Sequence, residues 1–412
     1  MSVPEASPHS MAGIRGIPRT VVALGFVSLF MDISSEIIHS LLPVFLVTAL
    51  GASALSVGFI EGIAEAATPI TKLFSGAISD WIGKRKPLVL LGYSLAAATK
   101  PLFPLASGVG TVLIARFVDR IGKGIRGAPR DALIGDVTPA ELRGTAFGLR
   151  QSMDTVGAFV GPLLAMLIMA ASSDDFRLVF WVAVVPAIVS VLLILYGVQE
   201  PDVPHTTERR PFPIQPSELR RLDLAYWWLV GVATILMLGR FSEAFLLLAA
   251  EHVGLGLALI PGVLVTMNVI YAASAYPFGL LSDAVRRRML LVFGAIFLIA
   301  ADAVLATAGT RWQVFVGVCL WGLHMGATQG LLSTLVVDAA PADLRGTALG
   351  IYNLITGIAL LAASVLAGWL WTAFGPAATF VAGGAFAGIA LLGMLSLRSG
   401  MFQCSPTKYD RA

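Results

Sequence analysis

Twelve long apolar runs dominate this sequence, and they decide which folds are open to it. Each run is long enough for a helix to cross the ~30 Å hydrocarbon core of a bilayer, which takes about 20 residues. Only 13% of the 412 residues are charged and 57% are apolar, whereas soluble domains carry about 25% charge. This composition excludes soluble enzymes, disordered chains, coiled coils and disulfide scaffolds. The sequence predicts an all-α membrane protein with twelve spans, at 20–49, 55–79, 87–106, 110–133, 145–171, 176–198, 224–250, 258–281, 289–308, 312–337, 346–372 and 376–397.

The connections between the runs divide the chain into two halves. Most connections are short, but residues 199–223 contain five prolines and many charges, which is typical of a solvated hinge. We therefore expect a cytoplasmic segment at 1–19, a six-helix bundle at 20–198 and a cytoplasmic linker at 199–223. A second six-helix bundle follows at 224–398, and a cytoplasmic tail at 399–412.

The basic residues indicate the orientation of the spans. With the N-terminus inside, 17 Lys and Arg residues fall on the cytoplasmic side and only Arg177 and Arg311 on the other side. Cytoplasmic loops carry such an excess of positive charge. Both termini are therefore predicted in the cytoplasm, and the protein in the cell (inner) membrane. We expect the first span to act as an uncleaved signal.

An internal repeat relates the two halves. Residues 136–148 (DVTPAELRGTAFG) and 338–350 (DAAPADLRGTALG) are identical at 9 of 13 positions, at an offset of 202. A second pair, GAISD at 76–80 and GLLSD at 279–283, has an offset of 203. Chance similarity between cytoplasmic loops is the alternative, but two matches at nearly one offset favour a parallel repeat. Parallel repeats place a substrate site near the bilayer midplane, between the halves.

The loop after the second span carries a known motif. The pattern G-x-x-x-D-[RK]-x-G-[RK]-[RK] is matched here by Gly76, Asp80, Gly83, Lys84 and Arg85, with Trp81 in place of a basic residue. Together with twelve spans in two halves and a long central loop, this motif resembles the major facilitator superfamily. The resemblance covers nearly the whole chain and implies a transporter that works by alternating access.

The resemblance also implies a set of gating contacts. It suggests that Asp80 caps the helix that starts near Arg345, and that Arg85 pairs with Asp131 or Asp136. A carboxylate is stabilised at a helix N-terminus by the helix dipole. The predicted gating residues are Gly76, Asp80, Gly83, Arg85, Asp131, Asp136, Arg143, Asp283 and Arg345.

The fifth span carries a second motif. Gly157, Gly161 and Pro162 resemble the G-x-x-x-G-P signature of antiporters, with Ala165 where a glycine is usual. From the residues alone, the two glycines form a flat face for close helix packing, and the proline loosens the helix. Ordinary small-residue packing is the alternative, and antiport is favoured.

Ionisable residues within the spans are the main functional signal. Each costs at least ~2.5–3.5 kcal/mol to insert, so each is a functional candidate by default. About 18 of the 53 charged residues lie inside the predicted spans, 15 of them in the first half. In the first span, the helical period places Asp32, Glu36 and His39 within about 60° of arc. The first half also has, outside its fourth span, Glu61, Glu65, Lys72, Lys100, Arg150 and Asp154.

The fourth span carries a charged stripe. Its seven ionisable residues fall within about 140° of arc and extend ~22 Å along a helix, so this face must line the bundle interior or a water-filled cavity. Arg116 and Gly122 match the R-x-x-Q-G-x-G signature of the same family, which implies a role for Arg116 in proton coupling. The stripe comprises Arg116, Asp119, Arg120, Lys123, Arg126, Arg130 and Asp131.

Two interpretations of these charges stay open. Eight bases and seven acids of the first half can neutralise one another in a static network. A network that rearranges as access alternates is favoured, because an apolar core would serve a structural role at lower desolvation cost. The second half has only Arg240, Glu243 and Asp302 as clear intramembrane charges. It is predicted to supply an apolar, aromatic wall, with candidates Trp227, Trp228, Tyr271, Tyr276, Trp321 and Tyr352 and with His324 and Gln329 as polar groups.

The candidate site residues form two groups. A carboxylate that exchanges protons needs burial and a neighbouring cation. The predicted proton-coupling residues are Asp32, Glu36, Arg116, Glu61, Glu65 and Asp154. The predicted substrate-binding residues are Arg120, Lys123, Arg126, His39, Lys72, Lys100, Tyr271 and His324.

The sequence thus favours a secondary transporter that exports a small solute or drug in exchange for protons. Binding of an anionic metabolite or siderophore by the basic stripe is the first alternative. Divalent metal efflux is weaker, because no His- or Cys-rich motif is present. A non-transporting receptor would need a sensory domain, and an enzyme would need a nucleophile–base pair or a phosphate loop. We expect no cofactor, metal or nucleic acid, and a monomer whose partners are the solute, protons and the lipid bilayer.

Overall fold

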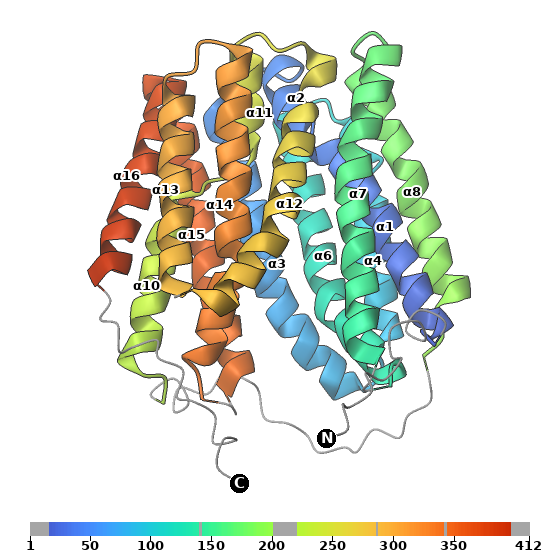
Figure 1. The fold of residues 1–412 in the computed structure, drawn as a ribbon. Helices are drawn as coiled ribbons and strands as arrows, with labels where there is room; N and C mark the ends of the chain where they lie inside the picture. Colours follow the sequence, from blue (N-terminus) through green and yellow to red (C-terminus); the bar gives the residue numbers. More distant parts are fainter. Residues whose placement is uncertain (1–15, 140–141, 201–220, 286, 342–343, 397–412) are drawn as a thin grey trace, which may run out of the picture.

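The chain folds into a bundle of long helices (Figure 1). The computed structural model describes residues 16–139, 142–200, 221–285, 287–341 and 344–396. Most of the predicted N-terminal segment, linker and tail therefore lies outside the described residues. The helices are α1 Arg19–His39, α2 Leu42–Thr48, α3 Ala54–Ile82, α4 Lys86–Thr99, α5 Leu102–Leu105, α6 Val109–Val137, α7 Arg143–Ala171, α8 Phe176–Gly197, α10 Leu224–Gly239, α11 Ala244–His252, the 3-10 helix η2 Leu257–Leu259, α12 Gly262–Ala284, α13 Arg287–Ala306, α14 Arg311–Asp338, α15 Arg345–Phe374 and α16 Pro376–Ser396.

These helices confirm the prediction of an all-α protein with twelve spans. Three spans are broken into the pairs α1–α2, α4–α5 and α10–α11, and the other nine are single helices. Within the described residues, ten spans are long and apolar enough to cross a membrane. The remaining two, α3 and α6, have 29 residues each, which is about 43 Å of helix at 1.5 Å per residue. Because α3 and α6 carry the most charge, their charged faces must be sheltered from lipid.

Two of the breaks lie at equivalent places in the repeat. α1 ends at His39, and an offset of 202 places this residue at Phe241, in the break between α10 and α11. Just after the first break, Pro43 in the first turn of α2 lacks the backbone N–H that a continuous helix would donate back to His39. In the second, the Ser242 amide donates a hydrogen bond to Ser364 Oγ at 3.2 Å instead of continuing α10. Discontinuous helices of this kind border the binding sites of many transporters.

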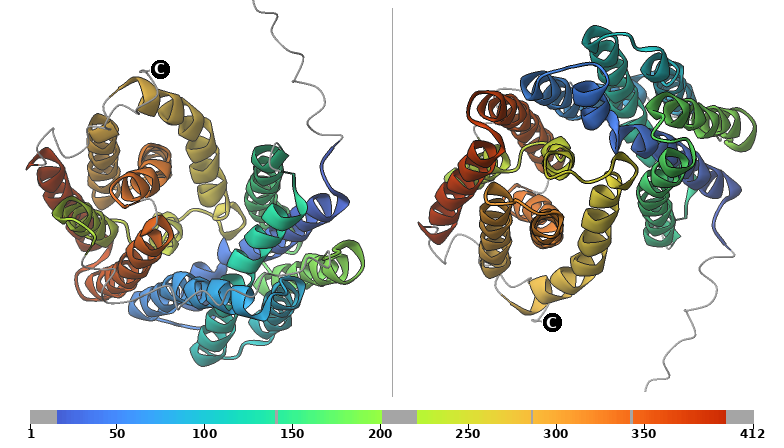
Figure 2. Two further views of the ribbon diagram at one scale, coloured as in Figure 1. Left: turned by 90° about the horizontal axis from the view of Figure 1, so that it is seen from below. Right: turned by 90° about the horizontal axis from the view of Figure 1, so that it is seen from above.

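The two halves form separate groups of helices (Figure 2), and each contains an ion pair at an equivalent place. In the first half, Arg85 at the start of α4 pairs with Asp136 near the end of α6, at 3.4 Å. In the second half, Arg287 pairs with Asp338. Both residues of the second pair follow those of the first at an offset of 202, so the sequence repeat is also a repeat of side-chain contacts.

Glycines join the halves along α3 and α15. A β-carbon on Gly62 would lie 2.8 Å from Leu361 Cδ1, and one on Gly368 would lie 2.5 Å from the Ala54 carbonyl oxygen. At one end of the contact, the Leu55 amide donates to Thr372 Oγ1 at 3.2 Å. Helices in lipid associate by such close packing of small residues, and α3 and α15 thus form the main contact between the halves.

The contact between the halves that α7 and α12 form is uneven. α3 ends at Ile82 and α12 at Ala284 at the same end of the bundle, which the basic residues predict to be cytoplasmic. We call it the basic end. α7 and α12 meet near the opposite end, where a β-carbon on Gly262 would lie 3.5 Å from Met166 Sδ. Toward the basic end α12 tilts away from α7 (Figures 1 and 2), which leaves room for a cavity between them.

The glycine contact between α3 and α15 makes a prediction about stability. Gly62→Ala places a methyl group too close to Leu361, and overpacking of this kind costs about 1–3 kcal/mol. Gly231 of α10 has no atom within 4 Å of its added β-carbon, so Gly231→Ala is a matched control that should be neutral or slightly stabilising. Thermal unfolding in detergent measures both, and equal melting temperatures for the two variants would contradict this packing.

Candidate functional site

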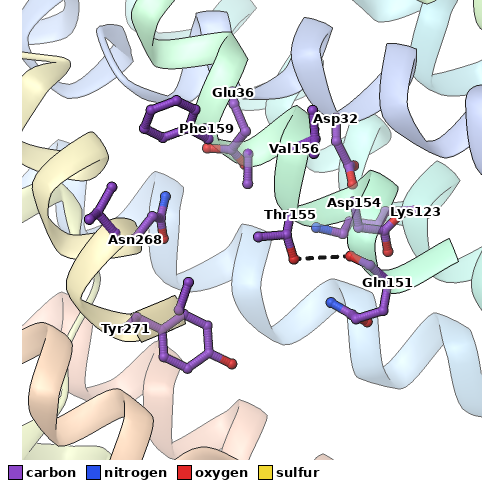
Figure 3. Close-up of a pocket in the computed structure, with 13 residues that line it drawn as sticks. Asp32, Glu36, Lys123, Gln151, Asp154, Thr155, Val156, Phe159, Asn268 and Tyr271 are labelled. Atoms are coloured by element: carbon purple, nitrogen blue, oxygen red, sulfur yellow. Dashed lines mark hydrogen bonds between the residues drawn. The ribbon is translucent and has the colours of Figure 1, made fainter. Parts of the chain in front are cut away.

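A cavity of about 430 Å³ lies between α1, α6, α7 and α12. Its charged lining residues are Asp32 and Glu36 of α1, Lys123 of α6 and Asp154 of α7. Figure 3 shows these groups across the cavity from the side chains that α12 contributes. The polar lining residues are Gln151, Thr155, Asn268 and Tyr271, and the apolar ones are Val156, Ala158, Phe159, Val269 and Ala272. The cavity thus lies between the halves, where a parallel repeat predicts a substrate site.

The two glycines of the fifth-span motif position the acids of α1. A β-carbon on Gly157 would lie 2.9 Å from Asp32 Cβ, and one on Gly161 would lie 2.7 Å from Glu36 Cβ. Both glycines are buried. α7 therefore packs on α1 at the level of these two carboxylates. The glycines of the packing motif thus contact the residues of the acidic face directly.

The charged side chains of the α6 stripe point toward different neighbours. Arg116 is 2% exposed and its Nη2 lies 2.8 Å from Glu61 Oε2 of α3. The guanidinium carbon of Arg126 lies 4.4 Å from the centre of the Tyr93 ring of α4, a cation–π distance. These bases are therefore buried against α3 and α4.

Another four charged residues of this region lie outside the cavity as well. Arg120 Nη2 lies 3.7 Å from Glu65 Oε1. Lys100 Nζ lies 2.9 Å from Asp119 Oδ1 and donates to Ser35 Oγ at 3.0 Å. Of the predicted substrate-binding bases, Arg120, Arg126 and Lys100 are thus engaged with other residues away from the cavity lining.

Lys123 is the base of the stripe that reaches the cavity. Its side chain is exposed and, within the described residues, it forms no ion pair. Gly122 and Gly124 on either side of it let α6 lie close to its neighbours. A β-carbon on Gly122 would be 2.7 Å from the Gly92 carbonyl oxygen of α4, and one on Gly124 would be 2.8 Å from that of Thr68 in α3.

His39 joins the cavity to the buried acid of α3. His39 Nδ1 lies 3.5 Å from Glu36 Oε2, and its Nε2 lies 3.7 Å from Glu61 Oε2. Glu61 is fully buried, whereas Glu36 lines the cavity. The sequence assigned this histidine to substrate binding, and the structure places it behind the cavity wall.

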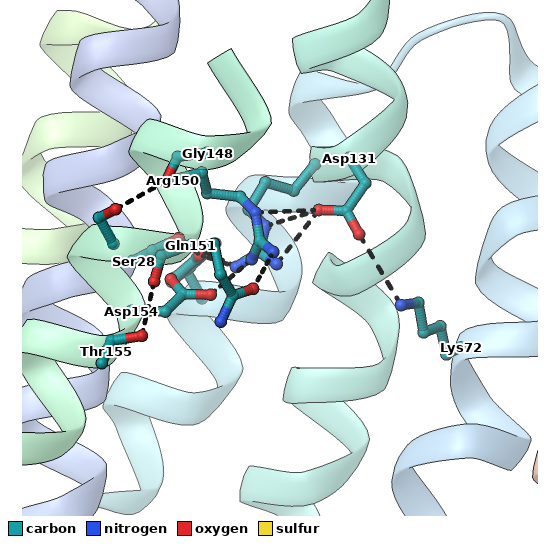
Figure 4. Close-up of polar contacts among 11 residues, drawn as sticks. Ser28, Lys72, Asp131, Gly148, Arg150, Gln151, Asp154 and Thr155 are labelled. Carbon is teal, nitrogen blue, oxygen red and sulfur yellow. Dashed lines mark hydrogen bonds and ion pairs between the residues drawn. The ribbon is translucent and has the colours of Figure 1, made fainter. Parts of the chain in front are cut away.

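A second network lies nearer the basic end (Figure 4). Asp131 of α6 lies 3.8 Å from Lys72 Nζ of α3, 3.2 Å from Arg130 Nη2 and 3.9 Å from Arg150 Nε of α7. Arg150 also pairs with Asp154 at 2.5 Å, one turn along α7. This network connects a cavity carboxylate to three helices, and it places Lys72 with Asp131 rather than in the cavity.

The predicted residues of the second half are distributed differently. Tyr271 lines the cavity with Asn268, one turn away on α12. His324 is buried, with its Nδ1 2.8 Å from the Gly294 carbonyl oxygen of α13. Trp227 and Trp228 are exposed on the outside of the bundle. The other residues considered for this half are buried (Trp321, Tyr352 and Asp302), exposed (Gln329) or, in the case of the Tyr276 side chain, outside the described residues.

The gating residues are placed only in part. Of the two acids suggested for Arg85, Asp136 is the partner, and Arg85 Nη1 also donates to Ser79 Oγ at 2.7 Å. Arg143 and Arg345 are exposed at the start of α7 and α15. The side chains of Asp80 and Asp283 lie outside the described residues.

Several residues of the site were not predicted from the sequence. The Glu200 carboxylate accepts hydrogen bonds from the backbone amides of Arg85 and Lys86, which ties the start of the linker to the loop motif. Gln151, Thr155 and Asn268 in the cavity are uncharged, and the search for ionisable residues passed over them. Their spacing from Asp154 and Tyr271, one to three residues on the same helices, was the available signal.

Comparison with known proteins identifies the family. The family model described as Major Facilitator Superfamily matches residues 24–267 and 244–401. This chain belongs to the major facilitator superfamily. It is therefore a multi-pass membrane protein and a secondary transporter, not an enzyme.

Sequence relatives and structural neighbours of this protein also point to the major facilitator superfamily. It is 33% identical over 391 residues to an MFS-type transporter of Methanocaldococcus jannaschii, covering 92% of this chain and 95% of the relative. It is 26% identical to the multidrug resistance protein MdtH of Cronobacter sakazakii, covering 86% and 84% of the two chains. A crystal structure of the nucleoside transporter NupG superposes with a TM-score of 0.78 at 11% identity, covering 93% and 100%, which shows the shared fold.

The buried ion pairs predict a ranking of stability effects. The side chains of Lys100 and Asp119 are 2% and 4% exposed, so Lys100→Met leaves an unpaired buried carboxylate and should cost about 3–5 kcal/mol. Adding Asp119→Leu should restore most of this loss. Lys72, with a side chain that is 51% exposed, provides the control, because Lys72→Met should cost at most about 1 kcal/mol. Unfolding in detergent measures the order, and similar losses for both single variants would refute it.

Proposed function

We propose that the protein exports a small amphipathic solute with a positive charge in exchange for protons. The observation that supports this proposal is the charge of the cavity lining, where Asp32, Glu36 and Asp154 face a single base, Lys123. With Asp154 paired to Arg150 behind the lining, the two acids of α1 still outnumber that base. A cleft lined by an excess of one charge concentrates ligands of the opposite charge. The apolar lining, including Phe159, suits the uncharged part of such a molecule.

Exchange follows if protons and solute compete for the same carboxylates. Asp32 forms no ion pair or hydrogen bond within the described residues, so it is available to either ligand. If the cavity binds one of them at a time, alternating access moves the two in opposite directions. Because Gly157 and Gly161 pack directly on Asp32 and Glu36, a change in the charge of these acids acts on the α1–α7 contact. The multidrug resistance relative and the antiporter-like glycine motif support this direction of transport.

An anionic solute has less support. That alternative relies on the basic stripe of α6, but Arg120 lies against Glu65 and Arg126 against Tyr93. Only Lys123 of the predicted anion-binding bases faces the cavity. One ammonium beside three carboxylates disfavours a free anion.

The sign of the solute charge can be tested with two probes of the same shape. Tetraphenylphosphonium is a cation and tetraphenylborate its anionic counterpart. We expect purified protein to bind the cation, and Asp32→Asn to weaken binding about 10–100-fold, the equivalent of ~1.5–3 kcal/mol for a contact to a charged group. Lys123→Gln should tighten binding of the same probe. Preference for the anion, with binding lost in Lys123→Gln, would overturn the cationic assignment.

Proton coupling can be tested separately by flux. In proteoliposomes, an imposed pH gradient should drive tetraphenylphosphonium against its own gradient. Asp32→Asn and Glu36→Gln should abolish the pH-driven component, because an amide cannot exchange a proton. Asp302→Asn is the matched control: Asp302 is a buried intramembrane acid on α13, away from the cavity, and this variant should keep the coupling. Full pH-driven flux in both α1 variants would rule out these acids as the coupling site.

A further inference from the structure

His39 stands between two carboxylates, one at each ring nitrogen. Nδ1 faces Glu36 at 3.5 Å and Nε2 faces Glu61 at 3.7 Å. The exposed fraction of the side chain falls along this series, from 22% for Glu36 to 10% for His39 and 1% for Glu61. The imidazole therefore links the cavity surface to the dry interior between α1, α3 and α6.

The chemistry of imidazole makes this arrangement sensitive to protons. A neutral ring has one N–H donor and one nitrogen lone pair, whereas the protonated ring has two donors. With a carboxylate at each nitrogen, only the protonated ring can donate to both. In the neutral ring, one carboxylate oxygen faces a lone pair, which is repulsive. The Glu36–His39–Glu61 unit is thus built to hold one proton.

The buried end of the unit has a second arrangement available. Glu61 Oε2 is shared by Arg116 Nη2 and His39 Nε2. Glu61 Oε1 and Arg116 Nε are both buried without a hydrogen-bond partner. Unsatisfied buried groups of this kind are costly, so loss of the contact from His39 favours a rotation of Glu61 toward a fuller pairing with Arg116. A side chain with two discrete arrangements can transmit a change of charge.

Charges from both halves face this histidine. Its own helix supplies Glu36 and α3 supplies Glu61, the two acids in contact with the ring. Behind these acids, α6 supplies Arg116, Arg120 and Lys123, and α3 supplies Glu65 beside Arg120. The second half supplies Glu243 and Arg240, from the break between α10 and α11, with Glu243 in electrostatic range of His39. Acids and bases therefore alternate around the imidazole, and the carboxylates at its two ring nitrogens are the groups that favour its protonated form.

The position of Glu243 connects the proton to the conformational change. His39 and Glu243 lie at the repeat-equivalent breaks of two helices, and α11 packs against α2 and α3 of the first half. When the halves separate at the end opposite the basic end, Glu243 moves away with the second half. The histidine then loses one of the carboxylates that favour its protonated form.

We propose that His39 is the proton-relay residue of this transporter, holding a proton between Glu36 and Glu61 while Glu243 is docked and releasing it when Glu243 withdraws. The inference rests on the proposed proton coupling. A proton enters from cavity water by way of the Glu36 carboxylate and forms the second N–H of the ring. On release, the ring returns one proton to water and becomes neutral again, so the relay is restored after each cycle.

Distance measurements between spin labels test the relay without any solute. Labels at Ala49→Cys and Leu259→Cys, both exposed near the end opposite the basic end, report the separation of the halves after Cys319 and Cys404 are replaced by Ser. We expect the distance distribution to change between about pH 5 and pH 8, the range in which histidine titrates. His39→Gln keeps a donor and an acceptor but no titratable proton, and it should lose this pH response.

Two further variants control for effects unrelated to the proton on His39. His324→Gln is the matched control, because the side chain of this buried histidine of the second half has its one hydrogen bond within the described residues with the Gly294 carbonyl oxygen, and it should keep the full response. Glu243→Gln removes a carboxylate that favours the protonated ring, so the midpoint should move to lower pH. This variant gives a readout even if His39→Gln fails to fold.

The outcomes separate the relay from the proposed function. A normal pH response in folded His39→Gln, or an unchanged midpoint in Glu243→Gln, overturns the relay. If Asp32→Asn and Glu36→Gln still abolish pH-driven flux, proton coupling stands and only the role of His39 falls. If these flux variants behave as the unmodified protein, Asp32 and Glu36 fall as the coupling site, and a lack of pH-driven flux in the unmodified protein would overturn the proposed function itself.

Discussion

The charges that α6 carries into the bilayer must be neutralised or hydrated, and the arrangement of the first half depends on this requirement. An unpaired charge in hydrocarbon costs several kcal/mol. Arg116 lies against Glu61, and Asp119 lies against Lys100. Such pairs form only if the helix backbones come close, which Gly122 and Gly124 permit. The glycines of α6 therefore make it possible for its charged residues to be neutralised.

The parallel repeat produces two six-helix halves of similar backbone arrangement whose interiors differ in chemistry. Both halves keep the ion pair at the basic end, Arg85–Asp136 in one and Arg287–Asp338 in the other. The first half fills its interior with ion pairs, whereas the second half fills it with apolar and aromatic side chains. A cavity between unlike walls can bind a charged group on one side and an apolar surface on the other. The contact between α3 and α15 holds these walls together while α7 and α12 diverge.

Much of this protein was readable from its sequence, but the grouping of the charges was not. The twelve spans follow from apolar length alone, and the repeat follows from matching loops. The helical period places Arg116, Arg120, Lys123 and Arg126 on one broad face, and the sequence could go no further. A face of about 140° contacts more than one neighbouring helix. Its side chains can therefore point in different directions, some toward α3, some toward α4 and some into the cavity. Which base reached the cavity depended on the crossing of α6 with its neighbours.

The sequence by itself determined the fold class, the two halves, the family and the set of charges within the spans, because these depend on local composition and spacing. The tertiary structure decided which charges meet. It paired Arg85 with Asp136 rather than Asp131, left Lys123 facing three carboxylates, and set His39 between Glu36 and Glu61. Spacing along one helix fixes which residues share a face. The partner of each face is fixed only when three or four helices pack, since the partners come from distant parts of the chain.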